Sequence, residues 1–348
     1  MSISKKEFGV TKDGAQAYLY TICNENGMEA SVTDYGAILV KLMVPDKTGK
    51  KTDLVLGYDK LSDYEVNGCF FGATIGRSAN RIGGASFVLD NVRYELPANE
   101  NGNNLHTDKE HGFHKVMWQA ELLPEDDAVR FSYVSPDGEN GFPGMLRISV
   151  TFTLLSDMGI QITYDGVSDR KTLMNITNHS YFNLQGHDAG SILNEKMMIC
   201  ADAFTEIMPG SIPTGRVLLV EGTPMDFRTA RRIGDRIDED FPQLVLGQGY
   251  DHNWALNTAF GQVEKIAQVE DEEAGRTMEV WSDLPGVQFY TGNCITPQIG
   301  KGGAHYNRRC ALCLETQYFP DSIHHPEFRQ PVFEAGQPYH SITIYKFR

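Results

Sequence analysis

The chain has 348 residues, of which 41% are hydrophobic and 22% are charged, as in ordinary folded proteins and unlike disordered or fibrous ones. Its 31 Lys and Arg residues against 46 Asp and Glu residues give a formal net charge of −15, which would repel a nucleic-acid backbone, so we expect no nucleic-acid partner. No stretch approaches the roughly 18 uninterrupted apolar residues of a membrane span, and no apolar run follows the first lysines, so we expect neither membrane association nor export.

The six cysteines are scattered along the chain and do not form the dense framework of a small disulfide-bonded protein. Cys310 and Cys313 lack a second pair at the spacing of a zinc finger, so we predict neither zinc nor redox chemistry there. We therefore predict reduced thiols and a cytoplasmic location. The two glycosylation sequons at 175–177 and 178–180 matter only in a secreted protein.

Short runs of β-branched and aromatic residues recur along the chain, separated by segments rich in Pro, Gly, Asn and Asp. The clearest strands are expected at 17–22, 37–44, 146–155 and 341–347, and the clearest turns at 45–50, 96–104 and 135–144. This spacing favours hairpins over βαβ units. It predicts an all-β fold, a large antiparallel β-sandwich with few short helices.

One helix is predicted at 226–237, where Asp226 could cap the N-terminus although Gly234 weakens the pattern. Two polar regions, 100–116 and 202–252, are predicted as long connections, which is where binding groups tend to lie on a rigid scaffold. No repeat or linker divides the chain, so we predict a single domain over 1–348, with a split into two domains as the alternative.

Five segments combine imidazole, carboxylate, amide or guanidinium groups with apolar neighbours. A general acid and a general base could come from among His106, His179, Asp251 and Glu315, although sequence separation does not say which of them lie close together. The five segments are GRSANRIGG at 76–84, NNLHTDKEHGFHK at 103–115, NITNHSYFNL at 175–184, GQGYDHNW at 247–254 and CLETQ at 313–317. The glycines at 76–84 do not match a dinucleotide-binding fingerprint.

The ordered set of motifs resembles the galactose mutarotase (aldose 1-epimerase) family. The resemblance extends over nearly the whole chain and rests on GRSANRIGG, NLH at 104–106, TNHSYFNL at 177–184, GYDHN at 249–253, PGVQFYTGN at 285–293 and LETQYFPD at 314–321, with DLVLGYD at 53–59 and PDGENGFPG at 136–144 in addition. It implies a β-supersandwich with an open cleft, a monosaccharide as the binding partner, and interconversion of the α and β anomers of a free aldose.

The resemblance also implies roles for seven residues. Glu315 matches the base that acts on the anomeric hydroxyl, and His179 matches the acid that protonates the ring oxygen. The matched substrate-binding positions are Asn80, Arg81, His106, Asp251 and Gln288.

The chemistry accounts for these residue types, because sugar hydroxyls are weak acids and ring ethers are weak bases. With reference pKa values of about 4.3 and 6.5, Glu is ionised and His partly protonated near neutrality, and a nearby carboxylate would raise the His pKa further. Nothing is oxidised, reduced or transferred to a second substrate, so we expect no cofactor and no metal.

Some residues depart from the family pattern. Thr107 and Asp108 stand where the family has small glycines, so their side chains could narrow the cleft, and His114 stands where the family often has Asp and is interpreted as peripheral. Trp254, Phe289 and Tyr318 could stack on a pyranose, but core packing is an equally good interpretation of each, and none is counted as a site residue.

Other interpretations remain open. Glu315 could be a structural ion-pair partner of Arg81. A hexose-6-phosphate 1-epimerase-like enzyme would need an additional basic pocket, and a glycoside hydrolase would need two carboxylates flanking the scissile bond, for which Asp251 and Glu315 could be imagined. A non-catalytic sugar-binding protein could dispense with either of the two proton-transfer residues, and both are present here.

Overall fold

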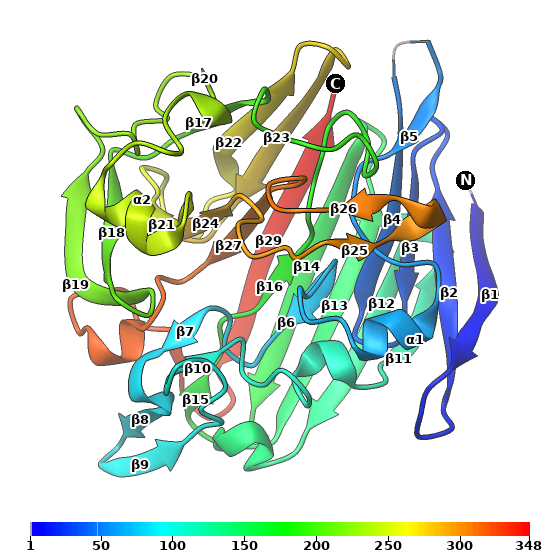
Figure 1. Ribbon diagram of the computed structural model, residues 1–348. Helices are drawn as coiled ribbons and strands as arrows, with labels where there is room; N and C mark the ends of the chain where they lie inside the picture. The colour runs from blue at the N-terminus through cyan, green and yellow to red at the C-terminus, as the bar shows by residue number, and fades with distance from the viewer. Residues whose placement is uncertain (1, 47) are drawn as a thin grey trace.

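A nine-stranded antiparallel sheet runs through the middle of the computed structural model, which describes residues 2–46 and 48–348 (Figure 1). The spatial order is β11 (Gln119–Leu123), β12 (Ala128–Ser135), β13 (Leu146–Leu154), β14 (Gly159–Ser168), β29 (Pro338–Phe347), β23 (Arg276–Ser282), β22 (Glu264–Asp271), β17 (Lys196–Ile199) and β20 (Arg231–Arg232). Strand β13 shows why the sequence forms it, because fully buried residues alternate with more exposed ones along LRISVTFTL.

Two five-stranded antiparallel sheets accompany the large one. The N-terminal sheet is a meander of β1 (Ser2–Val10), β2 (Gln16–Cys23), β3 (Glu29–Thr33), β4 (Ile38–Pro45) and β5 (Lys51–Asp53). The second has the order β19 (Ile212–Leu219), β18 (Ala203–Met208), β21 (Asp251–Ala255), β24 (Gly286–Tyr290) and β27 (Cys313–Gln317).

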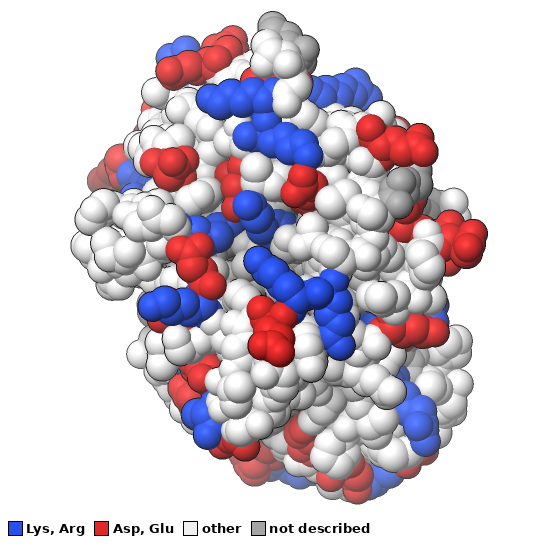
Figure 2. All heavy atoms as spheres, turned by 90° about the vertical axis from the view of Figure 1, so that its right-hand side faces the viewer, with Lys and Arg blue, Asp and Glu red and all other residues white. Residues whose placement is uncertain are grey.

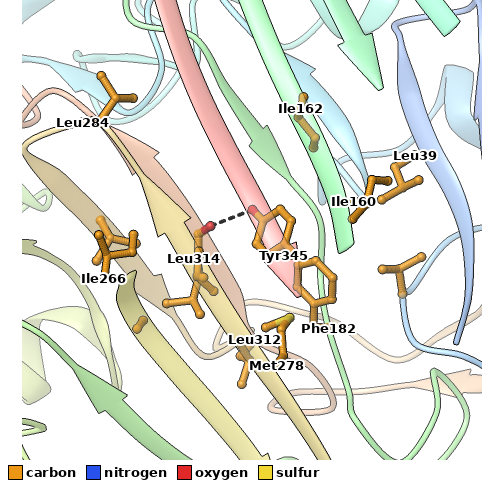
Figure 3. Packing of buried hydrophobic residues seen from close by; sticks show 14 of the residues in the cluster. Leu39, Ile160, Ile162, Phe182, Ile266, Met278, Leu284, Leu312, Leu314 and Tyr345 are labelled. Carbon is orange, nitrogen blue, oxygen red and sulfur yellow. Dashed lines mark hydrogen bonds between the residues drawn. The ribbon is translucent and has the colours of Figure 1, made fainter. Parts of the chain in front are cut away.

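Both smaller sheets pack against the large sheet through one apolar core. On the N-terminal side, the rings of Tyr20 in β2 and Phe131 in β12 meet edge to face, with centroids 5.6 Å apart. On the other side, the hydroxyl of Tyr345 in β29 donates a 2.9 Å hydrogen bond to the carbonyl oxygen of Leu314 in β27 (Figure 3). The core cluster includes residues from Tyr20 to Phe347, which favours the single domain over 1–348 that stays a prediction.

Short elements fill the rims. The helices are α1 (Leu61–Glu65) and α2 (Pro242–Gly247), and the two-stranded sheets are β6 (Ala73–Ile75) with β16 (Thr177–His179), β7 (Arg81–Ile82) with β10 (Asn104–Leu105), β8 (Ser86–Leu89) with β9 (Val92–Glu95), β15 (Thr172–Leu173) with β28 (Val332–Phe333), and β25 (Gln298–Ile299) with β26 (His305–Tyr306). The predicted antiparallel all-β fold with few short helices is therefore confirmed. The four predicted strands are also confirmed as β2, β4, β13 and β29. Residue 47, in the turn predicted at 45–50, lies outside the described residues.

The helix predicted at 226–237 is wrong. This segment contains only the short strand β20 and one 3-10 turn at Ile233–Asp235. The carboxylate of Asp226 accepts a hydrogen bond from the backbone N–H of Arg228, which stabilises a local turn instead of a helix start. The N–H groups of Ile233 and Gly234 donate to the carbonyl oxygens of Glu195 and Leu193, so they are not available to a helix.

Of the two predicted long connections, one is confirmed and one is largely wrong. The segment 100–116 is irregular except for β10 and one 3-10 turn. The segment 202–252 instead begins with the β18–β19 hairpin and also contains α2. The hairpin forms because Gly210 adopts a positive φ of 89° at its tip and lets the chain reverse.

The charged surface is mixed in sign. Figure 2 shows a band of Lys and Arg side chains across the face that carries the N-terminal sheet, with Asp and Glu set among and around them. No helix in the described part of the chain is long and apolar enough to cross a membrane.

Candidate active site

All seven predicted site residues line one cleft of about 220 Å³. They come from β7 and the residue just before it, β16, β21, β24, β27 and the irregular segment after β10. Segments far apart in the sequence are therefore brought together at one place, which sequence separation alone did not reveal. Their roles in binding and catalysis stay predictions.

Strand β27 forms one wall of the cleft and is buried on both faces. Because side chains alternate along a strand, Cys313, Glu315 and Gln317 share one face while Leu314 and Thr316 share the other. Leu314 belongs to the apolar core, and the Thr316 hydroxyl forms a hydrogen bond with that of Thr343 in the large sheet. The first face is polar and turned toward the cleft, where Gln288 of the neighbouring β24 stands directly opposite Glu315.

The ring of His179 is held firmly opposite Glu315. Its Nε2 atom lies 3.6 Å from Oε1 of Glu315, and its Nδ1 atom lies 3.5 Å from the Sγ atom of Cys313. The ring is stacked between Tyr181 and Phe70, with centroid distances of 5.0 and 5.8 Å. This sandwich leaves the imidazole little freedom to rotate.

Burial dominates the electrostatics of this pair and reverses the expected pKa pattern. Glu315 and His179 are only 2% and 4% exposed. Desolvation raises the pKa of Glu315 well above its usual value and lowers the pKa of His179 to about 4. The expectation that the pKa of His179 is raised is therefore wrong for the free cleft, and Glu315 keeps its proton to a higher pH than a Glu side chain usually does. Burial disfavours the charged form of each group, so it favours a neutral imidazole on His179 and a proton on Glu315.

His106 presents a hydrogen-bond donor to the cleft. Its backbone is in the left-handed region at φ 53°, and its Nδ1 atom accepts a 3.1 Å hydrogen bond from the backbone N–H of Asn80. Desolvation, with the charges of His179 and Arg81, lowers the pKa of His106 well below its usual value, so the ring is neutral. A neutral ring that accepts at Nδ1 carries its proton on Nε2.

Arg81 and Asp251 form the polar side of the cleft. The guanidinium of Arg81 is paired with the carboxylate of Glu100, with Nε to Oε2 at 2.5 Å, so the alternative of a structural Arg81–Glu315 ion pair is wrong. The Oδ1 atom of Asp251 accepts a 2.7 Å hydrogen bond from the side-chain amide of Gln288. Burial raises the pKa of Asp251, while the nearby Arg81 and the amide of Gln288 oppose that rise.

Comparison with known proteins identifies the family. The aldose 1-epimerase family model matches residues 18–346. The chain is 36% identical to galactose mutarotase from Rattus norvegicus, with 100% of this chain and 99% of that protein covered. It is 35% identical to aldose 1-epimerase from Escherichia coli (strain K12), with 96% of each covered. The chain belongs to the aldose 1-epimerase family.

Solved structures agree with this assignment. An aldose epimerase homologue from C. elegans matches with a TM-score of 0.87 at 26% identity and covers 95% of this chain and 99% of its own. Galactose 1-epimerase from Lactobacillus acidophilus matches with a TM-score of 0.86 at 24% identity, covering 100% of this chain and 98% of its own, which supports the fold. The resemblance inferred from the sequence motifs is thereby confirmed, and the chain is an enzyme of the epimerase class.

The epimerase departs from the family motif at Thr107 and Asp108, but neither side chain lines the cleft. The backbone of Thr107 adopts φ 69°, a conformation that favours glycine, and its hydroxyl exchanges two hydrogen bonds with the backbone of Ser78. Asp108 accepts hydrogen bonds from the N–H groups of Glu110 and His111. The idea that these side chains narrow the cleft is therefore wrong.

His114 supports the site of the epimerase from outside the cleft. It is buried, and its ring packs edge to face on Phe70 with centroids 4.9 Å apart. Phe70 in turn stacks on His179. The interpretation of His114 as peripheral is confirmed in the sense that it does not line the cleft.

Sequence reasoning missed several lining residues. Trp254, Phe289 and Tyr318 belong to the core, whereas the aromatic rings that line the cleft are Phe70, Tyr181 and Tyr290. Tyr181 and Tyr290 lie inside the recognised motifs, two positions after the predicted site residues His179 and Gln288, and that proximity was the available signal. Glu100 and Lys109, which also line the cleft, lie in the region 100–116 where binding groups were expected but were not singled out, and nothing in the sequence marked Phe70.

The cluster of His106, His179 and Glu315 does not fit a divalent metal well. Ligand atoms of these three residues lie within 4.8 Å of one another, which is close enough for a metal. However, the Asn80 N–H occupies the lone pair on Nδ1 of His106, so the neutral ring keeps its proton on Nε2 and offers no second lone pair. The prediction that the reaction uses no metal and no cofactor stays a prediction.

Proposed function

We propose that this epimerase interconverts the α and β anomers of a free aldose, with Glu315 as the base and His179 as the acid. The observation that carries the proposal is the 3.6 Å approach of His179 Nε2 to Glu315 Oε1 at a cleft lined by hydrogen-bonding groups. The Oε2 atom of Glu315 has no hydrogen-bond partner among the described residues, so it is free to accept a proton from a bound hydroxyl.

One proton on the pair is sufficient for the whole cycle. Two arrangements of the pair contain the same number of protons: protonated Glu315 with neutral His179, and a Glu315 carboxylate with a His179 imidazolium. The second arrangement is the reactive one, and it therefore forms without a proton from solvent. From it, the carboxylate takes the anomeric hydroxyl proton, C1 becomes a carbonyl carbon, and the bond from C1 to the ring oxygen breaks. The imidazolium protonates the ring oxygen. Rotation about C1–C2 and reclosure through the reverse transfers give the other anomer.

Substrate binding falls to Asn80, Arg81, His106, Asp251 and Gln288. The Nε2–H of His106 and the guanidinium of Arg81 donate hydrogen bonds, while the carboxylate of Asp251 accepts them. A cleft with donors and acceptors on one side and the rings of Phe70, Tyr181 and Tyr290 elsewhere suits a molecule with a polar edge and an apolar face, as in a pyranose.

Galactose and glucose are the first sugars we propose, because curated relatives at 35–38% identity carry the name galactose mutarotase. A sugar phosphate is less well supported, since the Arg81 guanidinium is already neutralised by Glu100 and only Lys109 adds another basic side chain to the described lining of the cleft. A cytoplasmic location is proposed on the basis of six cysteines that are all unbridged.

Polarimetry tests the proposal. Freshly dissolved α-D-galactose and α-D-glucose should approach anomeric equilibrium faster with the native protein than without it. Glu315→Gln and His179→Gln should each lose roughly 10²–10⁴-fold of kcat, as expected when one proton-transfer group is removed. Native protein that adds nothing to the spontaneous rate with any free aldose would overturn the proposal, and sugar phosphates would then be tested. Circular dichroism of each variant serves as the folding control.

A further inference from the structure

Behind the wall of the cleft lies a residue with no assigned role, Gln317. It is fully buried and stands two positions after Glu315 on β27, on the same face of the strand. It does not line the cleft, but its side-chain amide contacts two of the residues that do. Its Oε1 atom accepts a 3.3 Å hydrogen bond from Asn80, and its Nε2 atom donates a 3.2 Å hydrogen bond to Gln288.

These contacts belong to a continuous chain of hydrogen bonds. The backbone N–H of Arg81 donates to Oδ1 of Asn80 at 2.9 Å, and the chain then passes through Asn80, Gln317 and Gln288. Gln288 finally donates to Oδ1 of Asp251 at 2.7 Å. Every bond points in the same direction, from the main chain of Arg81 to the carboxylate of Asp251.

The groups at the two ends of this hydrogen-bond chain fix the direction in which its members donate. A carboxylate accepts hydrogen bonds, so Gln288 must turn its NH₂ group toward Asp251 and its oxygen toward Gln317. A backbone N–H only donates, so Asn80 must turn its oxygen toward Arg81 and its NH₂ group toward Gln317. Gln317 is the one side chain that satisfies both neighbours, because an amide has a donor and an acceptor at opposite corners. Its second N–H is used by Asn253 at 3.1 Å.

We propose that Gln317 is a positioning residue that sets the orientation of the amides of Asn80 and Gln288, and thereby the pattern of donors and acceptors that the cleft offers to sugar hydroxyls. With Gln317 in place, Gln288 presents its remaining N–H beside the free oxygen of Asp251. If Gln288 turned over, its oxygen would face the Asp251 carboxylate and the pattern would be inverted. The inference rests on the proposed function of the same cleft.

The hydrogen bonds from Arg81 through Asn80, Gln317 and Gln288 to Asp251 form a relay, and three substitutions test it. Gln317→Met keeps the shape but removes the donors and the acceptor, and Gln317→Glu keeps the shape but replaces the NH₂ group by an oxygen. Thr316→Val is the matched control, because it removes one buried hydrogen bond from the opposite face of the same strand, toward Thr343. The measurements are KM and kcat by polarimetry with galactose, and the Kd of 1,5-anhydro-D-galactitol, a galactose analogue without an anomeric hydroxyl, by NMR titration.

We expect Gln317→Met to raise KM and Kd about tenfold, with kcat within about threefold of native, because ground-state and transition-state binding weaken together. Thr316→Val should leave both constants unchanged. In Gln317→Glu, KM and Kd should rise further as the pH rises, because only the protonated acid can donate to Gln288. Circular dichroism over the same pH range shows whether the fold is kept, so that a rise in Kd without unfolding can be assigned to the lost hydrogen-bond donor.

Each outcome decides one question. If Gln317→Met folds and binds the analogue as tightly as the native protein, the relay is wrong. If Gln317→Met does not fold, the relay is tested by the pH dependence of Kd in Gln317→Glu. A Kd of this variant that follows the same pH profile as that of the native protein would show that the relay is wrong. Native protein that binds the analogue but does not accelerate mutarotation would contradict the proposed function alone, since the Kd series would still measure the relay.

Discussion

The close pair of Glu315 and His179 makes the pH dependence of the epimerase predictable. Activity requires one proton on the pair, so it should fall when the pair gains a second proton or loses its only one. Because burial lowers the pKa of His179 to about 4, we expect the acid limb of kcat/KM near pH 4. Because burial raises the pKa of Glu315, we expect the alkaline limb well above the usual range of a Glu side chain.

A pH profile of kcat/KM measured by polarimetry checks this expectation. Asp251 titrates in the same cleft with a pKa raised by burial, so an Asp251→Asn variant separates its contribution from that of the pair. An acid limb at the ordinary histidine value of about 6.5 would contradict the dominance of desolvation.

Single residues also mark the limit of what the sequence could reveal. The motifs led to seven residues that all line the cleft, because the family resemblance could be carried over position by position. They did not reveal that the pKa shifts of Glu315 and His179 are governed by burial, since the depth of a side chain depends on elements distant in sequence. The partner of Arg81 was missed for the same reason, as Glu100 lies in an unremarkable polar turn.

At the scale of elements, one turn connects the strand of Glu315 to that of Arg81. Asp321 follows β27 in a left-handed conformation at φ 55°. Its backbone N–H donates to the carbonyl oxygen of Arg81 at 2.9 Å, and its carboxylate accepts from the N–H of Gly83 at 2.8 Å and from His324 at 2.6 Å. The turn therefore fixes β7 relative to β27, and with it the position of Arg81.

We expect Asp321→Ala to lower the free energy of unfolding by about 1–3 kcal/mol, because the Gly83 N–H and His324 lose their buried partner. KM should rise as well, since Arg81 is less firmly held. Asp321→Asn should have a smaller effect, because Asn tolerates the left-handed conformation and keeps one acceptor. Urea unfolding and polarimetry measure the two effects, and Asp90→Ala, in the exposed turn between β8 and β9, is the control that should leave KM unchanged.

The strands were predictable where polar and apolar residues alternate, as in β13, and the turns where Pro, Gly, Asn and Asp cluster. The false helix at 226–237 shows the weakness of a short helical pattern, since its backbone groups find stronger partners in the segment around Leu193 and Glu195. The β18–β19 hairpin was missed because its sequence, rich in Pro and Gly, has the composition of a loop.

At the scale of the whole molecule, a buried ion pair joins the N-terminal sheet to the segment between β24 and β27. The Nζ atom of Lys301 lies 2.6 Å from Oδ2 of Asp53 and donates to the carbonyl oxygen of Val40 at 2.7 Å. Both side chains of the pair are less than one tenth exposed. Removing one member leaves the other charge buried without its partner.

Lys301→Met should therefore lower the free energy of unfolding by about 3–5 kcal/mol. Arg93→Met breaks a pair that lies in solvent, with Glu95, and should leave stability unchanged. Both are measured by urea unfolding monitored by circular dichroism. Equal effects of the two substitutions would mean that the Lys301–Asp53 pair does not hold the N-terminal sheet in place.

The central position of β29 has a consequence for biosynthesis. This strand follows every other described strand in the chain, yet it lies in the middle of the large sheet between β14 and β23. Until the ribosome has released it, β11–β14 and the group from β23 to β20 are separate pieces, and each exposes an open edge to other nascent chains. The epimerase should thus be most prone to aggregation in the interval before β29 has emerged, when chaperones that shield strand edges would matter most.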